Sequence, residues 1–255
     1  MAQQSLPVTY PKKRRVEKRP RSRARLYVAA IASATLAASA LVIASQLSGA
    51  GTREAASATA QLTGTTDSAA VFSGIPQRRA VLGSPQAPVT LVEYADLQCP
   101  YCGEFSRNAL PSLVAEYVRT GKVKLVFRGL AFVGPESEPA LRGALAAGHQ
   151  NRLWNFVHLL YENQGVENSG WITDGFIHSV AGSIPGVDVT RLTTDTLSTS
   201  VTEEIAAAQR LATSDGVNST PSFRVGRTGG TLTALDVHSL DPAAFRPTLD
   251  QLLKR

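Results

Sequence analysis

The chain has 255 residues, 43% of them hydrophobic, which is enough for a buried core and excludes a disordered or fibrous protein. Its net charge of +6 is local, because residues 1–25 carry nine Lys or Arg and one acid, leaving −2 for the rest of the chain. Without an excess of positive charge, the rest of the chain lacks the main feature of a nucleic-acid-binding protein, so no nucleic-acid partner is expected.

Residues 26–47 contain no charged side chain and directly follow the basic tail of residues 1–25. As a helix rising about 1.5 Å per residue, this run would span roughly 33 Å, close to the hydrocarbon thickness of a bilayer. It predicts a single transmembrane helix that acts as a signal anchor, with a cleaved signal peptide ending near residues 47–50 as the alternative. The positive-inside rule keeps the basic tail in the cytoplasm, so the C-terminal part is expected outside it, attached to the cell membrane.

Residues 48–79 are rich in Gly, Ala, Ser and Thr with little periodic apolar content, which predicts a flexible linker. The folded domain is therefore expected at residues 80–255. No internal repeat of 20 to 50 residues is visible, which excludes solenoids and propellers.

The first predicted strand of this domain, PVTLVEYAD at residues 88–96, is apolar and β-branched. The only two cysteines of the chain, Cys99 and Cys102, follow it and open a helical pattern that stops near residues 120–121 and should be kinked by Pro111. A second strand is expected next. The sequence thus predicts a βαβ unit with CxxC at its first turn, the second strand being KVKLVFRGLAF, residues 122–132.

Helical periodicity then continues from about residue 136 to 214, which predicts a helical block inserted into a sheet protein. Two further strands, at residues 220–226 and 231–237, are separated by a glycine-containing turn and predict a hairpin. A last helix is expected to begin at Pro242 with Asp241 as its N-cap. The overall prediction is an α/β domain behind a single transmembrane helix.

The position of the cysteines indicates redox chemistry. Outside the cytoplasm a lone pair of thiols is expected to form a disulfide. A sulfur at a helix N-terminus faces unpaired backbone N–H groups and the positive end of the helix dipole, which stabilise its thiolate. Cys99 is therefore the predicted nucleophile, and Cys102, one turn further, the predicted resolving cysteine.

Two acids lie close to the cysteines in sequence. Glu93 lies on the predicted strand among core-facing neighbours, where burial would raise the pKa of its carboxyl and allow it to exchange a proton with Cys102. The alternative is a surface Glu on an edge strand. Asp96, nearer the turn, is expected to be a solvated loop acid.

The segment EYADLQCPYC, followed by a helix, a long helical insertion, STPSF and a hairpin, resembles the DsbA-like branch of the thioredoxin superfamily, the exported thiol:disulfide oxidoreductases. The resemblance covers about residues 78–254 and implies a thioredoxin fold with an inserted helical subdomain. It also implies a cis-proline at Pro221, preceded by Thr220, whose backbone would pair with an extended substrate chain. Within the motif, the attacking cysteine, the resolving cysteine and the buried acid match Cys99, Cys102 and Glu93.

The resemblance implies an oxidase that introduces disulfides into unfolded or reduced exported proteins and uses no cofactor beyond its redox-active disulfide. A membrane quinone-linked reoxidant of the DsbB or vitamin K epoxide reductase-like kind is the implied partner. The dipeptide between the cysteines is Pro100-Tyr101, whereas strongly oxidising members often carry histidine at the second place, so a milder oxidant is expected. Reductase and isomerase activities use the same residues and remain alternatives.

Three other functions fit the cysteine pair less well. A structural staple across so short a loop would remove little unfolded-state entropy. A closed zinc site needs about four ligands, and the four histidines show no metal-ligand spacing, although a copper carrier with two thiolates remains an alternative. A non-catalytic scaffold would not need the dithiol and acid. Each histidine is expected on the surface or a helix face: His149, His158, His178 and His238.

Overall fold

The structure is a computed structural model that describes residues 62–254. The basic tail, the predicted transmembrane segment 26–47 and residues 48–61 of the predicted linker lie outside the described residues. Within residues 62–254, no helix is both long and apolar enough to cross a bilayer.

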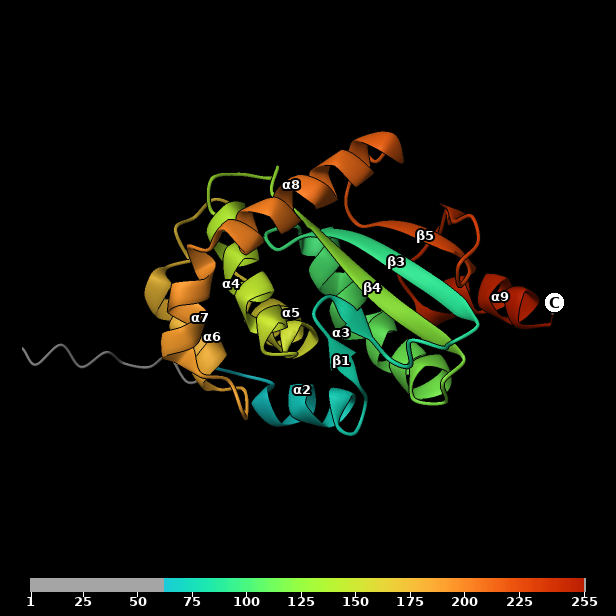
Figure 1. Cartoon of the computed structure of the whole chain (residues 1–255), viewed down its shortest axis with the longest axis horizontal. Helices are drawn as coiled ribbons and strands as arrows, with labels where there is room; N and C mark the ends of the chain where they lie inside the picture. The colour runs from blue at the N-terminus through green and yellow to red at the C-terminus, as the bar shows by residue number, and fades with distance from the viewer. Residues whose placement is uncertain (1–61, 255) are drawn as a thin grey trace, which may run out of the picture. The chain divides into compact units, whose positions relative to one another are not determined.

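Six strands form one mixed sheet in the order β1-β2-β4-β3-β5-β6 (Figure 1). The central strand β3 pairs in parallel with β4 and antiparallel with β5, and all eight of its residues are buried. Such burial on both faces explains the nearly continuous apolar run in its sequence. The strands are β1 (Gln77–Arg78), β2 (Val81–Leu82), β3 (Val89–Asp96), β4 (Val123–Leu130), β5 (Ser222–Arg227) and β6 (Thr233–Ala234).

Helices cover both faces of the sheet and continue beyond one end of it (Figure 1). Five of them occupy the interval between β4 and β5, where the sequence predicts a helical block. The helical elements are α2 (Thr65–Phe72), α3 (Pro100–Leu113), the π-helical turn η1 (Val114–Val118), α4 (Ser137–His149), α5 (Leu153–Glu162), α6 (Asp174–Gly182), α7 (Val189–Thr196), α8 (Thr199–Ser214) and α9 (Pro242–Leu253).

The two faces of the sheet pack against different helices. On one face, aromatic rings of Phe105 from α3, Phe223 from β5 and Phe245 from α9 have centroids 4.8 to 5.4 Å apart. On the other face, Tyr94 of β3 packs with Ala212 of α8 in a smaller apolar cluster. Because successive side chains of a strand point to opposite faces, Glu93 is directed toward the α3 side.

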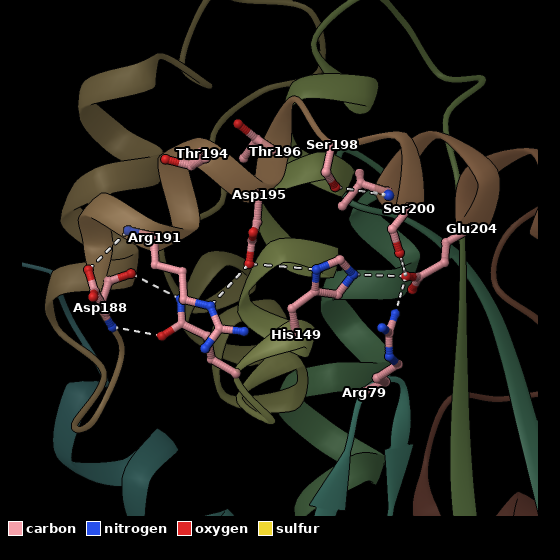
Figure 2. A network of polar contacts seen from close by, with 12 residues as sticks. Arg79, His149, Asp188, Arg191, Thr194, Asp195, Thr196, Ser198, Ser200 and Glu204 are labelled. Carbon is pink, nitrogen blue, oxygen red and sulfur yellow. Dashed lines mark hydrogen bonds and ion pairs between the residues drawn. The ribbon is translucent and has the colours of Figure 1, made fainter.

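Polar contacts tie the inserted helices to one another (Figure 2). His149 on α4 lies between two carboxylates, 2.8 Å from Glu204 of α8 and 3.6 Å from Asp195 of α7. Arg79, in the turn between β1 and β2, also pairs with Glu204, and Arg191 pairs with Asp195. These contacts join α4, α7 and α8 and connect them to the first hairpin of the sheet.

The prediction of a flexible linker up to residue 79 is wrong for its last part. Helix α2 and strand β1 lie within residues 62–79, and Phe72 is only 3% exposed in the main core. Arg119 donates hydrogen bonds to the carbonyls of Val71 and Ser73, at 2.9 and 2.7 Å, and so fixes the end of α2. The folded domain therefore begins before residue 80. The sequence pattern did not reveal this because Phe72 is one large apolar residue among small ones.

Other element boundaries differ from the predictions in detail. Helix α3 continues through Pro111 and ends in the π-helical turn η1, and β6 is limited to two residues. Asp241 occupies the N-cap of α9 with Pro242 at the first helical position, as predicted. Its side chain does not cap the helix, because the carboxylate accepts a hydrogen bond from the Ser239 hydroxyl instead.

Candidate redox site at the start of helix α3

The two cysteines lie at the junction of β3 and α3. Cys99 is the N-cap of α3, with an extended backbone (φ −65°, ψ 121°), and Cys102 is in the first turn. The backbone N–H of Cys99 donates to the carbonyl of Asp96 at 2.9 Å, which closes the turn between strand and helix. Both sulfurs are unlinked; the Cys99 residue is 5% exposed and Cys102 is fully buried.

The surroundings of Cys99 favour its thiolate and lower the pKa of its thiol to about 6. The largest cause is a hydrogen bond with the Cys102 thiol, followed on the favourable side by one with the Thr220 side chain. Backbone N–H groups of Cys102 and Tyr101 also contribute, while burial opposes the change. The helix N-terminus therefore acts as predicted, but the neighbouring thiol has the larger effect.

Cys102 behaves in the opposite way. Burial raises the pKa of its thiol well above the usual range, and the hydrogen bond to Cys99 and the negative charges of Cys99 and Glu93 raise it further. Cys102 thus holds its proton at a pH where Cys99 has lost its own. The two sulfurs of one motif are chemically distinct, because one is stabilised as an anion and the other as a thiol.

Glu93 is buried on β3, in register with Phe127 of β4 and Phe223 of β5. Burial raises the pKa of its carboxyl to about 8, and the negative charge of Cys99 contributes in the same direction. Its Oε1 atom has no hydrogen-bond partner among the described residues. The interpretation of Glu93 as a core-facing acid is confirmed, and the alternative of a surface Glu on an edge strand is wrong.

Thr220 and Pro221 face the dithiol from the start of β5. The peptide bond between them is cis, as the resemblance implies, and the carbonyl oxygen of Thr220 lies 3.2 Å from the Sγ of Cys99. A thiol can donate to that carbonyl, whereas a thiolate cannot. Pro221 also lines a groove of about 290 Å³ that extends along residues 215–219, 221–224 and 234–237.

The dipeptide between the cysteines lies at the surface. Tyr101 is 62% exposed, and Pro100 lines a shallow pocket with residues 164–167, which include the exposed Val166. Proline at the first helical position has no N–H, so the donors left to face the sulfur belong to Tyr101 and Cys102. This arrangement leaves apolar surface beside Cys99.

Asp96 is not the solvated loop acid that was expected. It is fully buried, and its Oδ2 accepts hydrogen bonds from the backbone N–H groups of Phe132 and Val133, at 2.8 and 2.9 Å. Its Oδ1 accepts another from the N–H of Gln98 at 2.9 Å. A short carboxylate at the end of a parallel strand pair reaches the amides of both following loops, and this offsets the cost of burying it.

Polar side chains that the sequence did not point to hold the turn between β3 and α3 in place. The buried Gln98 exchanges hydrogen bonds with the loop after α5, accepting from the N–H of Asn168 at 2.8 Å, and also donates to the Ser137 hydroxyl at 3.0 Å. Gln164 in that loop donates to the carbonyl of Cys99 at 3.0 Å. No local sequence signal marks these residues, because their partners lie 39 to 70 positions away.

One histidine lies on a helix face, one of the two expected positions, but that face is buried. His158 is buried in α5, where its Nδ1 lies 2.9 Å from the Ser106 hydroxyl, and burial lowers the pKa of its ring to about 4. Ser106 is on α3, so this contact joins the helix that carries the cysteines to the inserted helices. Within residues 62–254, no three His, Cys, Asp or Glu side chains gather as metal ligands.

Comparisons with known proteins agree with this geometry. The thioredoxin family profile matches residues 77–235. A Bacillus cereus protein named probable disulfide bond formation protein D is 31% identical over 177 residues, covering 68% of this chain and 78% of that protein. The crystal structure of oxidised BdbD from Bacillus subtilis has a TM-score of 0.61 at 23% identity and covers 71% of this chain and 98% of its own.

A thioredoxin-like oxidoreductase from Silicibacter pomeroyi has a TM-score of 0.55 at 28% identity, covering 74% of this chain and 98% of its own. Together with the strand order and the helices between β4 and β5, these similarities confirm the expected thioredoxin fold.

Proposed function

Since this chain belongs to the thioredoxin family and is a protein disulfide oxidoreductase, we propose that it introduces disulfide bonds into reduced or unfolded exported proteins. The proposal places the enzyme outside the cytoplasm, held at the cell membrane by residues 26–47. The name of the Bacillus cereus relative, a disulfide bond formation protein, supports the direction of the reaction.

The observation that carries this proposal is the difference between the two thiols. A pKa of about 6 makes Cys99 a good leaving group, whereas the pKa of Cys102 is raised well above its ordinary value. A disulfide whose reduced form contains a stabilised thiolate is the more oxidising one. Compared with two ordinary thiols, the stabilised thiolate of Cys99 favours the dithiol over the disulfide, which supports transfer of the disulfide to a substrate.

The reaction follows from this difference. A substrate thiolate attacks the sulfur of Cys99, the bond between Cys99 and Cys102 breaks, and Cys102 takes up a proton. Glu93, protonated below its pKa of about 8, is the proposed donor of that proton. A second substrate thiolate then attacks the substrate sulfur of the mixed disulfide, and Cys99 leaves as the thiolate. The substrate loses two electrons and the dithiol gains them.

Thr220 and Pro221 are the proposed substrate-binding residues. The carbonyl of Thr220 faces the sulfur of Cys99, and backbone groups there can pair with an extended chain of any sequence. The groove beside Pro221 and the exposed apolar side chain of Tyr101 would add contacts with an unfolded substrate. This combination suits a broad range of unfolded chains.

Trapping of mixed disulfides tests the roles of the two thiols. Cys102→Ser lacks the second sulfur, which would release the substrate, so mixed disulfides with reduced exported proteins are expected to accumulate through Cys99. The matched variant Cys99→Ser should trap far less. Equal trapping by both variants would reverse the assignment, and absence of trapping with Cys102→Ser would argue against exchange through Cys99.

The reduction potential tests the direction of the reaction. A potential well above about −270 mV, the value of thioredoxin, supports the oxidase, whereas a value that low would favour a reductase.

Fractionation tests the location, because an enzyme anchored by residues 26–47 remains with membranes after a high-salt wash. Regeneration of the disulfide by a quinone-linked membrane protein is the proposed completion of the cycle, and purified membranes with added quinone should reoxidise the reduced enzyme.

A further inference from the structure

The carbonyl oxygen of Cys99 accepts hydrogen bonds from two directions. One comes from the N–H of Gly103 at 3.2 Å and is the first hydrogen bond of helix α3. The other comes from the side-chain amide of Gln164 at 3.0 Å, in the loop after α5. The inserted helical block is thereby connected to the backbone of the proposed nucleophile.

Gly103, the residue after the second cysteine, makes room for this contact. A Cβ atom at that position would lie 2.2 Å from the Oε1 of Gln164 and 2.8 Å from the Nη1 of Arg107, far closer than atoms can pack. Arg107, one turn further along α3, donates to the carbonyl of Tyr161 near the end of α5. The two helices thus fit together closely beneath the dithiol.

This contact should matter more to the reduced enzyme than to the oxidised one. In the oxidised enzyme, the covalent ring between Cys99 and Cys102 fixes the first turn of α3. In the reduced enzyme, only hydrogen bonds hold the Cys99 backbone so that the N–H groups of the turn point at its sulfur. The Gln164 amide also offsets the partial negative charge of the Cys99 carbonyl, which otherwise repels a thiolate.

We propose that Gln164 is a positioning residue that stabilises the reduced dithiol over the disulfide and so makes the enzyme more oxidising. The proposal rests on dithiol exchange at Cys99. Gln164 takes no part in bond making: it acts through the Cys99 backbone. The inserted helices, through this one amide, would then set the driving force of the reaction.

The test is the equilibrium of the full-length protein with glutathione, in which the enzyme disulfide and two glutathione molecules form the dithiol and one glutathione disulfide. Gln164→Ala is expected to lower this equilibrium constant about two- to tenfold, the effect of losing one hydrogen bond. The pH midpoint of Cys99 ionisation, followed by thiolate absorbance, should rise in parallel.

Gln150→Ala is the matched control. Gln150 also forms a hydrogen bond with the backbone of another loop, donating to the Asp188 carbonyl at 2.9 Å. It directly follows the C-terminal end of α4, a helix about 20 Å long, whereas Ser137 at the other end of α4 contacts Gln98 beside the dithiol. Its loss should lower the stability of the oxidised and reduced enzymes equally and leave the glutathione equilibrium unchanged. If Gln164→Ala does the same, Gln164 is merely structural and the proposal is wrong.

Two further variants keep the test decisive if Gln164→Ala fails to fold. Gln164→Glu retains the size of the side chain but replaces the donor with a carboxylate, so it should lower the constant more than Gln164→Ala. Gly103→Ala displaces the amide from the other side and should act in the same direction. An unchanged constant in both would overturn the proposal. Failure of the unaltered enzyme to exchange with glutathione would instead count against the proposed function.

Discussion

At the scale of single residues, the chemistry depends on two sulfurs that share a hydrogen bond. The largest cause of the low pKa of Cys99 is the thiol of Cys102, so the proposed resolving cysteine also makes the proposed nucleophile more acidic. A hydrogen bond to the charged form of a group favours that form. Changing Cys102 should therefore alter the acidity of Cys99 as well as remove the second thiol.

Cys102→Ala is expected to raise the pKa of Cys99 from about 6 toward that of an ordinary cysteine, because the main donor to its thiolate is lost. Cys102→Ser keeps a donor at the same position and should raise the pKa less. Thiolate absorbance as a function of pH measures both values. Identical titration curves for the two variants would show that the helix amides, rather than the neighbouring side chain, set the acidity.

Glu93 should make the fold less stable as the pH rises. Its folded pKa of about 8 exceeds the ordinary value of 4.5, so its contribution to stability is complete below pH 4.5 and is lost as the pH rises toward 8. Glu93→Gln cannot ionise and should gain stability over the unaltered protein across that range, by at most about 5 kcal/mol at about 1.4 kcal/mol per unit. Urea unfolding at pH 5 and pH 8 measures the gain; parallel curves would contradict it.

At the scale of elements, α2 belongs to the folded domain through Phe72. This ring packs edge-on against the ring of His158, with centroids 5.6 Å apart. Phe72→Ala should lower the free energy of unfolding by about 3 to 5 kcal/mol, since a buried aromatic side chain is lost and a cavity remains. Phe132, half exposed, is the matched control, and Phe132→Ala should change stability by less than about 1 kcal/mol. Denaturant unfolding compares the two, and equal effects would place α2 outside the cooperative unit.

The elements that the sequence predicts well are those with a regular apolar pattern. The buried run of β3 and the helix after Cys99 carry a local signal, whereas the cis-proline after Thr220 is implied only by the family resemblance; together they allow the centre of the site to be predicted. Helix α2 carries one large apolar residue among small ones, and its pattern resembles that of a linker. The roles of Asp96 and Gln164 depend on partners brought near only by the complete fold, which no local pattern reveals.

At the scale of the whole molecule, the charge on Cys99 couples the stability of the fold to its redox state. Because the folded pKa of about 6 lies below the ordinary value of 9.0, the stabilisation of the reduced form is complete above pH 9 and is lost as the pH falls to 6. At pH 7 it amounts to about 1.4 kcal/mol. The disulfide form has no such charge, so the two forms should differ in a pH-dependent way.

We expect the stability of the reduced enzyme relative to the oxidised enzyme to increase as the pH rises from 6 to 8. For a domain of this size, the difference of about 1.4 kcal/mol at pH 7 corresponds to a rise in Tm of about 3 to 6 °C. Thermal unfolding with and without a reductant measures it at each pH. A difference that stays constant over this range would show that Cys99 is not the group responsible.

Strand β3 is paired on both edges and buried on both faces, and Cys99 follows its end by only three residues. The backbone amides at the centre of such a strand are expected to exchange with heavy water last of all, when the entire domain opens. The sulfur of Cys99 therefore lies on a rigid part of the fold that cannot adapt its shape to a partner. The flexibility must come from the other molecule. The cysteines of a disordered polypeptide can therefore reach the sulfur more readily than cysteines buried in a folded protein.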